Sequence, residues 1–200
     1  ALFLGPNDIG IGKREAIKDI SRLFSRYNDL IMARLFDHSH IIELAEYSSI
    51  PVINGLTDYN HPCQIIADIL TVWEHRDNLD DLKITYMGDG NNIVHSWLQL
   101  ASKLPMHFVC CGPSGFEPDK KTIGMVEQSG ISKFELSNDP ISAVKDSDVI
   151  YTDVWASMGQ KEEFKEREKI FSDYQVNQKL MSYTGKETLF MHCLPAERGR

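Results

Sequence analysis

Four short stretches of this chain carry polar side chains of the kinds that bind and activate a small substrate. They are His61-Pro62-Cys63-Gln64, Gly88-Asp89-Gly90-Asn91-Asn92, Asp153 to Gly159, and His192-Cys193-Leu194-Pro195. They offer an imidazole, side-chain amides, a carboxylate, a hydroxyl and a thiol, which together suit the recognition of amines, carbonyls and carboxylates. Each stretch also has a purely structural interpretation.

His61 directly precedes a predicted helix over residues 62–76, with proline in its first turn. The free amides and the dipole of a helix N-terminus favour an anion or a polarised carbonyl oxygen. A histidine donor beside the Gln64 amide suits a small planar group, and Gln64 and Asp68 share one face of the helix. The alternative is that His61 and Asp58 are turn and cap residues.

Gly88 to Asn92 follows an apolar run and invites comparison with a dinucleotide-binding loop, which we reject. The third glycine of that pattern falls at Ile93, and the next apolar run ends in Cys110-Cys111-Gly112, without an acidic residue for a ribose. Asparagine side chains here suit a carboxylate or an amino-acid backbone. Alternatively, Asn91 or Asn92 caps the following helix, and we expect this of at least one of them.

Asp153 and Cys193 each follow a predicted buried strand. Asp153 can bind an ammonium group, and Ser157 lies in the loop that ends at Gly159. Cys193 can act as a nucleophile or as a hydrogen-bonding partner for an amine. Because side chains alternate along a strand, His192 is expected to point away from Cys193. The structural alternatives are a capping aspartate and a buried cysteine.

Arg34 interrupts the dense apolar run from Leu30 to Phe36. Burying an unpaired guanidinium is costly, so Arg34 either faces an anion in a cleft or sits at a strand end with its head group in water. The run alone favours the second interpretation.

A strand, a glycine turn and an amphipathic helix over Lys83 to Trp97 predict the start of a β-α-β unit. Further strands are predicted at residues 106–111, 133–136, 149–152 and 188–191, separated by helical patterns. Earlier in the chain, strands are predicted at residues 2–4, 30–36 and 51–54, and they alternate with helical patterns in the same way.

The predicted fold class is therefore α/β, with two sub-domains, each a largely parallel sheet with helices on both faces. The first comprises residues 1–76 and includes the joining helix over residues 62–76. Ile65, Ile66, Ile69, Leu70 and Trp73 are expected on the buried side of that helix. The second comprises residues 77–200. Ligands are expected at the carboxyl ends of the strands.

The composition excludes several classes of function. A net charge of −8 without a basic run argues against nucleic acid as a partner, and no apolar stretch has the length of a membrane span. The four cysteines show no metal-ligand spacing, which predicts reduced thiols. The sequence offers no recognisable site for a metal or a redox cofactor, and we expect neither. We expect a soluble intracellular protein.

Taken together, these stretches resemble the ornithine carbamoyltransferases. The resemblance is carried by IMAR (31–34), NGLTDYNHPCQIIAD (54–68), GDGNN (88–92), DVWASMG (153–159) and MHCLPAERG (191–199), and it runs along essentially the whole chain. It implies transfer of the carbamoyl group from carbamoyl phosphate to the δ-amine of ornithine in arginine biosynthesis, without a cofactor. It also implies a homotrimer. The sequences of these motifs are most similar to those of the plastidial plant or algal form.

The resemblance assigns a role to each matching residue. Arg34, His61, Pro62, Cys63 and Gln64 are implied to bind carbamoyl phosphate together with Cys193 and Leu194. Arg34 and His61 hold the carbonyl oxygen, and Gln64 holds the carbamoyl nitrogen. Ornithine is assigned to Asn92, Asp153, Ser157 and Met158, with Cys193 and the Leu194 carbonyl facing its δ-amine. Arg34, His61, Asp153 and Cys193 are the implied catalytic residues.

The chain lacks the family's Ser-Thr-Arg-Thr-Arg phosphate loop and its C-terminal segment. We therefore expect it to be the middle of a longer protein, and to be inactive as an isolated fragment. Three alternatives stay open at this point. They are a carbamoyltransferase for aspartate, N-acetylornithine or putrescine, a nucleotide-binding α/β fragment, and a non-catalytic relative.

Overall fold

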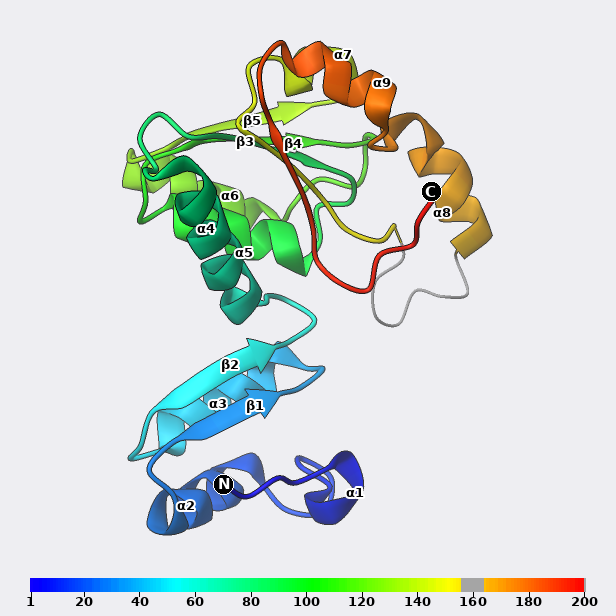
Figure 1. The fold of residues 1–200 in the computed structure, drawn as a ribbon. Coiled ribbons are helices and arrows are strands. Elements are labelled where there is room, and N and C mark those ends of the chain that lie inside the picture. Colours follow the sequence, from blue (N-terminus) through cyan, green and yellow to red (C-terminus); the bar gives the residue numbers. More distant parts are fainter. Residues whose placement is uncertain (156–163, 200) are drawn as a thin grey trace. The chain divides into compact units, whose positions relative to one another are not determined.

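The computed structural model describes residues 1–155 and 164–199, which form two compact units, Ala1–Cys63 and Gln64–Arg200 (Figure 1). Each unit is considered by itself below. Both are built from parallel strands flanked by helices, so the predicted α/β class is confirmed. The functional boundary predicted after residue 76 remains a prediction.

The first unit contains two parallel strands, β1 (Ile31–Arg34) and β2 (Val52–Leu56). Two helices, α2 (Ile17–Tyr27) and α3 (His38–Tyr47), pack on one face of this pair. Their shared core consists of Ile17, Ile41 and Leu44, and Ala33 and Val52 of the strands pack against it. The helices of the unit are α1 (Pro6–Ile9), α2 (Ile17–Tyr27) and α3 (His38–Tyr47). The crossover from β1 to β2 through α3 is the predicted β-α-β element.

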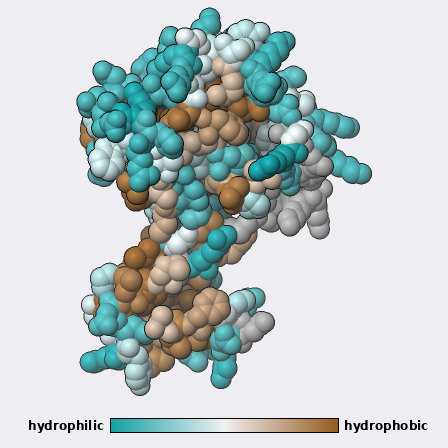
Figure 2. All heavy atoms as spheres, in the orientation of Figure 1, coloured by the Kyte–Doolittle hydropathy of each residue, from teal (hydrophilic) through white to brown (hydrophobic). Residues whose placement is uncertain are grey.

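Two features of the first unit differ from the sequence-based expectation. Leu2–Leu4 forms no strand, and Leu2 and Phe3 are exposed, so the pair lacks the third strand we predicted. Met32 and Ile53, which lie side by side on the face away from the core, are also exposed. Apolar side chains accordingly gather on the surface of this unit (Figure 2). The short apolar run at the N-terminus has no neighbouring strand to pair with, which is why alternation alone mispredicted it.

The second unit is built on a five-stranded parallel sheet in the order β5-β4-β3-β6-β7. Its strands are β3 (Lys83–Met87), β4 (His107–Cys111), β5 (Lys133–Ser137), β6 (Val149–Thr152) and β7 (Leu189–His192). All five follow the predicted runs closely, because each combines apolar or β-branched residues with a turn signal at its end. The chain builds outward from β3 to β5 and then returns to β6, which creates a topological switch point between β3 and β6.

Helices cover both faces of this sheet, as predicted (Figure 1). Ile84 and Tyr86 face one core, and Met87 faces the other, which is the alternation of a strand buried on both sides. The first core is closed by α4 (Pro62–Arg76), α5 (Asn92–Ala101) and α6 (Lys120–Ser129). The second core is closed by α7 (Pro140–Val144) and α9 (Gln178–Met181). The remaining described elements are helix α8 (Phe164–Phe171) and the short 3-10 turns η2 (Ser172–Tyr174) and η3 (Ser182–Thr184).

Helix α4 has the predicted bounds, but its buried side is rotated relative to the prediction. Ile65 and Ile69 are buried, as expected, whereas Ile66, Leu70 and Trp73 are 59%, 49% and 51% exposed. Val72 and the carboxylate of Asp68 are buried in their place. Asp68 can turn inward because it finds hydrogen-bond donors there, which a hydrophobicity pattern does not reveal.

A close approach of two backbone segments fixes the turn after β3. A Cβ atom on Gly90 would lie 2.3 Å from the Pro118 backbone nitrogen and 2.5 Å from the Glu117 carbonyl carbon. The Gly90 amide donates to the Phe116 carbonyl at 2.8 Å. The glycine therefore lets the chain after β4 run directly over this turn.

Among the described residues, no helix is both long and apolar enough to cross a bilayer.

Candidate active site

The switch point of the second unit brings together residues from three strand ends. Asn91 follows β3, Asp153 follows β6, and Cys193 follows β7. Because β6 pairs with both β3 and β7, the carboxyl ends of the three strands are neighbours. Open parallel sheets bind ligands at this position, where the two directions of chain crossing leave a crevice.

Asp153 is held by donors from both sides. The Asn91 side-chain amide donates to its Oδ2 at 2.9 Å, and the Cys193 thiol donates to its Oδ1 at 3.0 Å. The backbone amide of Val154 also donates to Oδ1, at 2.7 Å. These bonds fix the carboxylate in one orientation while leaving it only half-buried. A carboxylate held in this way is suited to accept hydrogen bonds from an ammonium group.

Asn91 is also the N-cap of α5. Its Oδ1 accepts from the backbone amides of Ile93 at 3.0 Å and Val94 at 3.4 Å, so the expectation that one asparagine caps this helix is confirmed. The cap orients the Asn91 amide nitrogen toward Asp153. Asn92, implied by the resemblance to bind the ornithine carboxylate, is the first residue of the helix and is half-buried.

Cys193 is buried, and its thiol donates its proton in a hydrogen bond to the Asp153 carboxylate. Burial raises the pKa of this thiol, and the neighbouring Asp153 carboxylate raises the same pKa further. The structure thus favours the hydrogen-bonding interpretation of Cys193 over the nucleophilic one. A thiolate at this position would lie against a carboxylate in a low-dielectric environment, which is unfavourable.

His192 does not point away from Cys193 as strand alternation predicted. A ring nitrogen of His192 lies within 4.8 Å of both the Cys193 sulfur and an Asp153 oxygen, and Nδ1 is hydrogen-bonded to the Cys193 carbonyl. The strand ends at His192, so the alternation no longer applies to Cys193. This correction puts an imidazole beside the Asp153 carboxylate.

Asp153, His192 and Cys193 are the one group of possible metal ligands that lie this close together in the part of the chain that the structure describes. The raised pKa of the Cys193 thiol opposes metal binding, because a cysteine binds zinc as the thiolate. The absence of a metal therefore remains our prediction.

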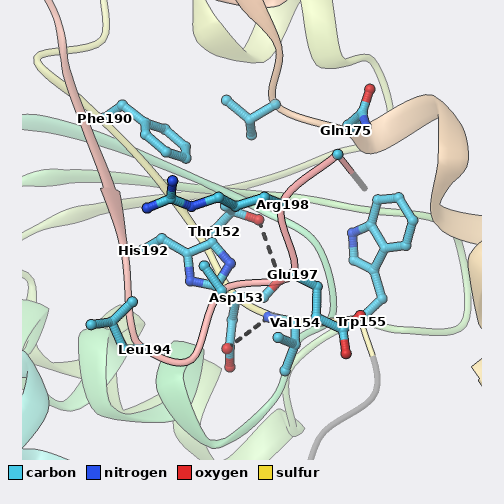
Figure 3. A pocket seen from close by; sticks show the side chains of 13 residues that line it. Thr152, Asp153, Val154, Trp155, Gln175, Phe190, His192, Leu194, Glu197 and Arg198 are labelled. Carbon is cyan, nitrogen blue, oxygen red and sulfur yellow. Dashed lines mark hydrogen bonds between the residues drawn. The ribbon is translucent and has the colours of Figure 1, made fainter.

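A cavity of about 460 Å³ opens beside Asp153 (Figure 3). It is lined by the ends of β6 and β7 and by the segment after β7, including Thr152, His192, Leu194 and Arg198. Its volume is within the range of small-ligand sites. Trp155, which closes one side, is buried. It stacks against Phe171 of α8 with ring centroids 6.2 Å apart.

An ion pair that the sequence analysis missed supports this region. Asp89, in the turn after β3, accepts from Arg167 of α8 at 2.7 Å, and both side chains are nearly buried. Arg167 also donates to the Trp155 carbonyl at 3.0 Å. Burial raises the Asp89 pKa, while Arg167 lowers it. The glycines around Asp89 signalled a turn, but nothing in the sequence paired it with an arginine so far along the chain.

The remaining predicted residues are distributed over both units. Gln64, in the first turn of α4, donates to Asp68 at 3.0 Å. In the first unit, Arg34 is exposed at the end of β1, and the Cys63 thiol donates to the Asn54 carbonyl at 3.2 Å. His61 and Pro62 are half-buried at the start of α4. Ser157 and Met158 lie outside the described residues, and a cleft shared by Arg34 and His61 with Asp153 stays a prediction.

Comparison with known proteins gives this arrangement a family. Residues 1–74 match the family model described as the carbamoyl-phosphate-binding domain of aspartate/ornithine carbamoyltransferase, and residues 80–200 match the model of its aspartate/ornithine-binding domain. The chain belongs to the aspartate/ornithine carbamoyltransferase family. Membership of this family confirms the resemblance noted from the motifs.

Individual relatives of the family cover the whole chain. It is 60% identical over 199 residues to the chloroplastic ornithine carbamoyltransferase of Pisum sativum and 50% identical over 202 residues to the ornithine carbamoyltransferase of Pyrococcus abyssi. These alignments cover 100% of this chain and 53% and 64% of the two relatives. The chain thus spans between half and two thirds of the length of these carbamoyltransferases.

Solved structures give the same result. The ornithine carbamoyltransferase of Pyrococcus furiosus matches with a TM-score of 0.90 at 47% identity, over 100% of this chain and 64% of that one. The anabolic ornithine carbamoyltransferase of Campylobacter jejuni matches with a TM-score of 0.92 at 32% identity, over 99% and 67%. The carbamoyltransferase fold therefore extends over essentially all of this chain.

Proposed function

We propose that the protein containing this chain transfers the carbamoyl group of carbamoyl phosphate to the δ-amine of L-ornithine, giving citrulline and phosphate. The observation that carries this proposal is the Asp153 carboxylate, held by Asn91 and Cys193 at the switch point of a family member. An anionic group at this point favours a substrate with a positive charge. It disfavours aspartate, whose second carboxylate requires cations there.

In the proposed reaction, the neutral δ-amine attacks the carbonyl carbon of carbamoyl phosphate. A carbon–nitrogen bond forms, the bond from that carbon to the phosphate oxygen breaks, and the nitrogen loses a proton as phosphate departs. Arg34 and His61 are proposed to stabilise the charge that develops on the carbonyl oxygen, and Gln64 to bind the carbamoyl nitrogen. Loss of one such oxyanion donor typically costs about 10²–10³ in rate.

The ornithine end of the site is proposed to lie in the second unit. Asp153 and Ser157 would bind the α-amine, Asn92 the carboxylate, and Met158 would contribute through its backbone. Cys193 and the Leu194 carbonyl would face the δ-amine. The raised pKa of the Cys193 thiol supports this role, because a neutral thiol can exchange hydrogen bonds with a neutral amine.

Positioning accounts for most of the proposed catalysis. Placing two bound reactants in line supplies about 7–11 kcal/mol of the barrier lowering. None of these steps requires a metal ion or a redox cofactor. We further propose that the protein works in arginine biosynthesis as a homotrimer, and in a plastid. The plastid proposal is supported by the name of the pea relative.

The direct test is citrulline formation by the full-length gene product, with ornithine compared against aspartate, N-acetylornithine and putrescine. We expect ornithine to be preferred, and Arg34→Ala and His61→Ala to lower turnover strongly while the protein stays folded. Lys133→Ala, at an exposed position on β5, is the matched control. Near-normal turnover in both site variants, or preference for another amine, would refute the proposal. The isolated 200-residue chain is expected to form no citrulline.

A further inference from the structure

Asp68 is a buried carboxylate to which the proposed reaction assigns no role. It lies one turn after Gln64 in α4 and is 8% exposed. Each of its oxygens accepts one hydrogen bond from a side chain. The Gln64 Nε2 donates to Oδ1 at 3.0 Å, and the Tyr151 hydroxyl donates to Oδ2 at 2.6 Å. This arrangement joins the first turn of α4 to strand β6.

We propose that Asp68 and Tyr151 fix the Gln64 side-chain amide so that its oxygen faces the ligand, and thereby select a carbamoyl NH₂ over groups without an N–H donor. The proposal rests on the function proposed above, in which Gln64 binds the carbamoyl nitrogen. Asp68 and Tyr151 act here as positioning residues, since neither is proposed to touch the substrate.

The chemistry of the three side chains determines the orientation of the amide. An ionised carboxylate has only acceptors, so Gln64 must turn its NH₂ toward Asp68. The opposite orientation would bring the amide oxygen against a carboxylate oxygen and leave both without a proton to share. With Nε2 held by Asp68, Oε1 is directed away from it. Oε1 is then available to accept an N–H from a ligand.

Tyr151 keeps Asp68 in the state that this orientation requires. Burial raises the pKa of Asp68, and the hydrogen bonds from Tyr151 and Gln64 act in the opposite direction. Tyr151 itself is fully buried, and burial raises its own pKa, so its hydroxyl remains a donor. It is held between Tyr86, at 6.1 Å between ring centroids, and Trp97, at 5.6 Å. The donor therefore has little freedom to leave the carboxylate.

The consequence is a test of substrate identity that does not depend on size. Acetyl phosphate has a methyl group where carbamoyl phosphate has an NH₂, and it keeps the same carbonyl and phosphate. An amide oxygen fixed toward the ligand gains a hydrogen bond with the carbamoyl group and gains nothing with the acetyl group. If the amide is free to rotate, only the binding of carbamoyl phosphate should weaken.

The experiment compares Asp68→Asn and Tyr151→Phe with the wild-type full-length gene product. The side chain introduced by Asp68→Asn can present either its oxygen or its nitrogen to Gln64, so the amide orientation is no longer fixed. For this variant we expect the KM for carbamoyl phosphate to rise about 3- to 10-fold, the range expected for one hydrogen bond. The inhibition constant of acetyl phosphate should change by less than about twofold. Tyr151→Phe should likewise raise the ratio of the KM for carbamoyl phosphate to the inhibition constant of acetyl phosphate.

Thr85→Val is the matched control, because Thr85 is a buried hydroxyl in the same sheet that bonds to Ser147 and the Ala143 carbonyl. Thr85→Val should lower thermal stability without changing the ratio of the KM for carbamoyl phosphate to the inhibition constant of acetyl phosphate. Equal weakening of carbamoyl phosphate and acetyl phosphate in Asp68→Asn, or no change in either, would overturn the proposal.

The amide orientation can also be measured without activity. In ¹⁵N-labelled protein, the Gln64 side-chain NH₂ signals, assigned with Gln64→Glu, should show one strongly protected proton in the wild type and lose that protection in Asp68→Asn. If the wild type forms no citrulline but this change occurs, the proposed function fails and the orienting role stands. Unchanged Gln64 signals would overturn the orienting role by itself.

Discussion

The thiol of Cys193 donates a hydrogen bond to the carboxylate of Asp153 at 3.0 Å, which links the carboxyl ends of β7 and β6. This bond explains why a cysteine at a strand end is protonated. The carboxylate is only half-buried, whereas the thiol is buried. Burial and the neighbouring carboxylate both raise the pKa of the Cys193 thiol, so its proton stays on the sulfur.

The four thiols should consequently differ in reactivity. Cys63 is exposed, whereas Cys110, Cys111 and Cys193 are buried. Burial raises the pKa of all three buried thiols, to about 12 for Cys111. Because only the thiolate is alkylated, iodoacetamide near pH 8 should modify Cys63 first. Peptide mass spectrometry checks this result, with urea-denatured protein as the control in which all four react. Labelling of Cys193 as fast as Cys63 would contradict the assignment.

Neutralising Asp153 should affect ornithine and spare the fold. Asp153→Asn keeps the size of the side chain and one oxygen, which can still accept from the Val154 amide and the Cys193 thiol. It gives up the acceptor for Asn91 and removes the negative charge proposed to bind the α-amine. We expect the KM for ornithine to rise at least about tenfold, since hydrogen bonds to charged groups contribute about 1.5–3 kcal/mol. Steady-state kinetics and a thermal melt measure the two effects.

Glu135→Gln is the control for Asp153→Asn because it removes the same charge from β5, where the Glu135 side chain is 47% exposed. It should leave the KM for ornithine unchanged. An equal KM change in both variants would mean that net charge, rather than Asp153, attracts the substrate.

Much of the fold could be predicted from local patterns, and the failures have identifiable causes. Helix α4 has the predicted bounds because a proline at its start and its apolar spacing both act within a few residues. The inward face of the same helix was mispredicted because Asp68 is buried by partners in a distant strand, among them Tyr151. Similarly, Leu2–Leu4 has the composition of a strand but lacks a neighbour to pair with.

In the candidate site, too, local sequence patterns predicted some features and missed those that depend on long-range packing. Asp153 and Cys193 were found because each follows a strand of the parallel sheet, and sequence predicts strand ends well. Their hydrogen bond and the Asn91 contact were not predicted, because they depend on the order of strands in the sheet. The Asp89–Arg167 pair was not predicted because it depends on where helix α8 packs. Strand order is a long-range property that hydrophobic periodicity does not encode.

Gly90 should tolerate no side chain. Gly90→Ala would place a methyl group against the backbone of Glu117 and Pro118, which cannot move as a side chain can. We expect a loss of several kcal/mol in the free energy of unfolding, beyond the about 1–3 kcal/mol typical of overpacking. Urea denaturation of both variants measures the effect, with Gly124→Ala as the control.

Gly124 lies within α6, and a Cβ atom there would meet nothing nearer than the Gln128 side-chain nitrogen at 3.9 Å. Gly124→Ala should therefore stabilise the protein by up to about 1 kcal/mol through helix propensity. If the two alanine variants had similar stability, the close approach at Gly90 would be excluded.

Asp89 and Arg167 should behave as a coupled pair. Arg167→Met leaves a nearly buried carboxylate without its cation, and breaking such a pair typically costs about 3–5 kcal/mol. Asp89→Asn in the same protein should recover part of that loss, because the remaining amide carries no charge. A double-mutant cycle by urea denaturation measures the coupling. Additive effects of the two substitutions would show that the ion pair contributes nothing to holding α8 against the turn after β3.

Asp68 should make the protein less stable as the pH rises. Burial raises its folded-state pKa above the ordinary 3.8, so between these two pKa values the folded state holds a proton that the unfolded state has lost. The Asp68 contribution to stability is therefore complete below pH 3.8 and is lost as the pH rises through the folded pKa. The stability of Asp68→Asn relative to wild type should accordingly increase between about pH 4 and pH 7.

Glu135→Gln provides the opposite slope for comparison. Hydrogen bonds from Lys133 and His107 lower the pKa of Glu135, so its contribution to stability is present above the ordinary pKa of 4.5 and is lost as the pH falls. The stability of Glu135→Gln relative to wild type should therefore decrease over the same pH range. Urea denaturation at several pH values measures both slopes. Slopes of the same sign would contradict the assignment of Asp68 as a carboxylate whose ionisation is opposed by burial, because the two substitutions remove the same charge.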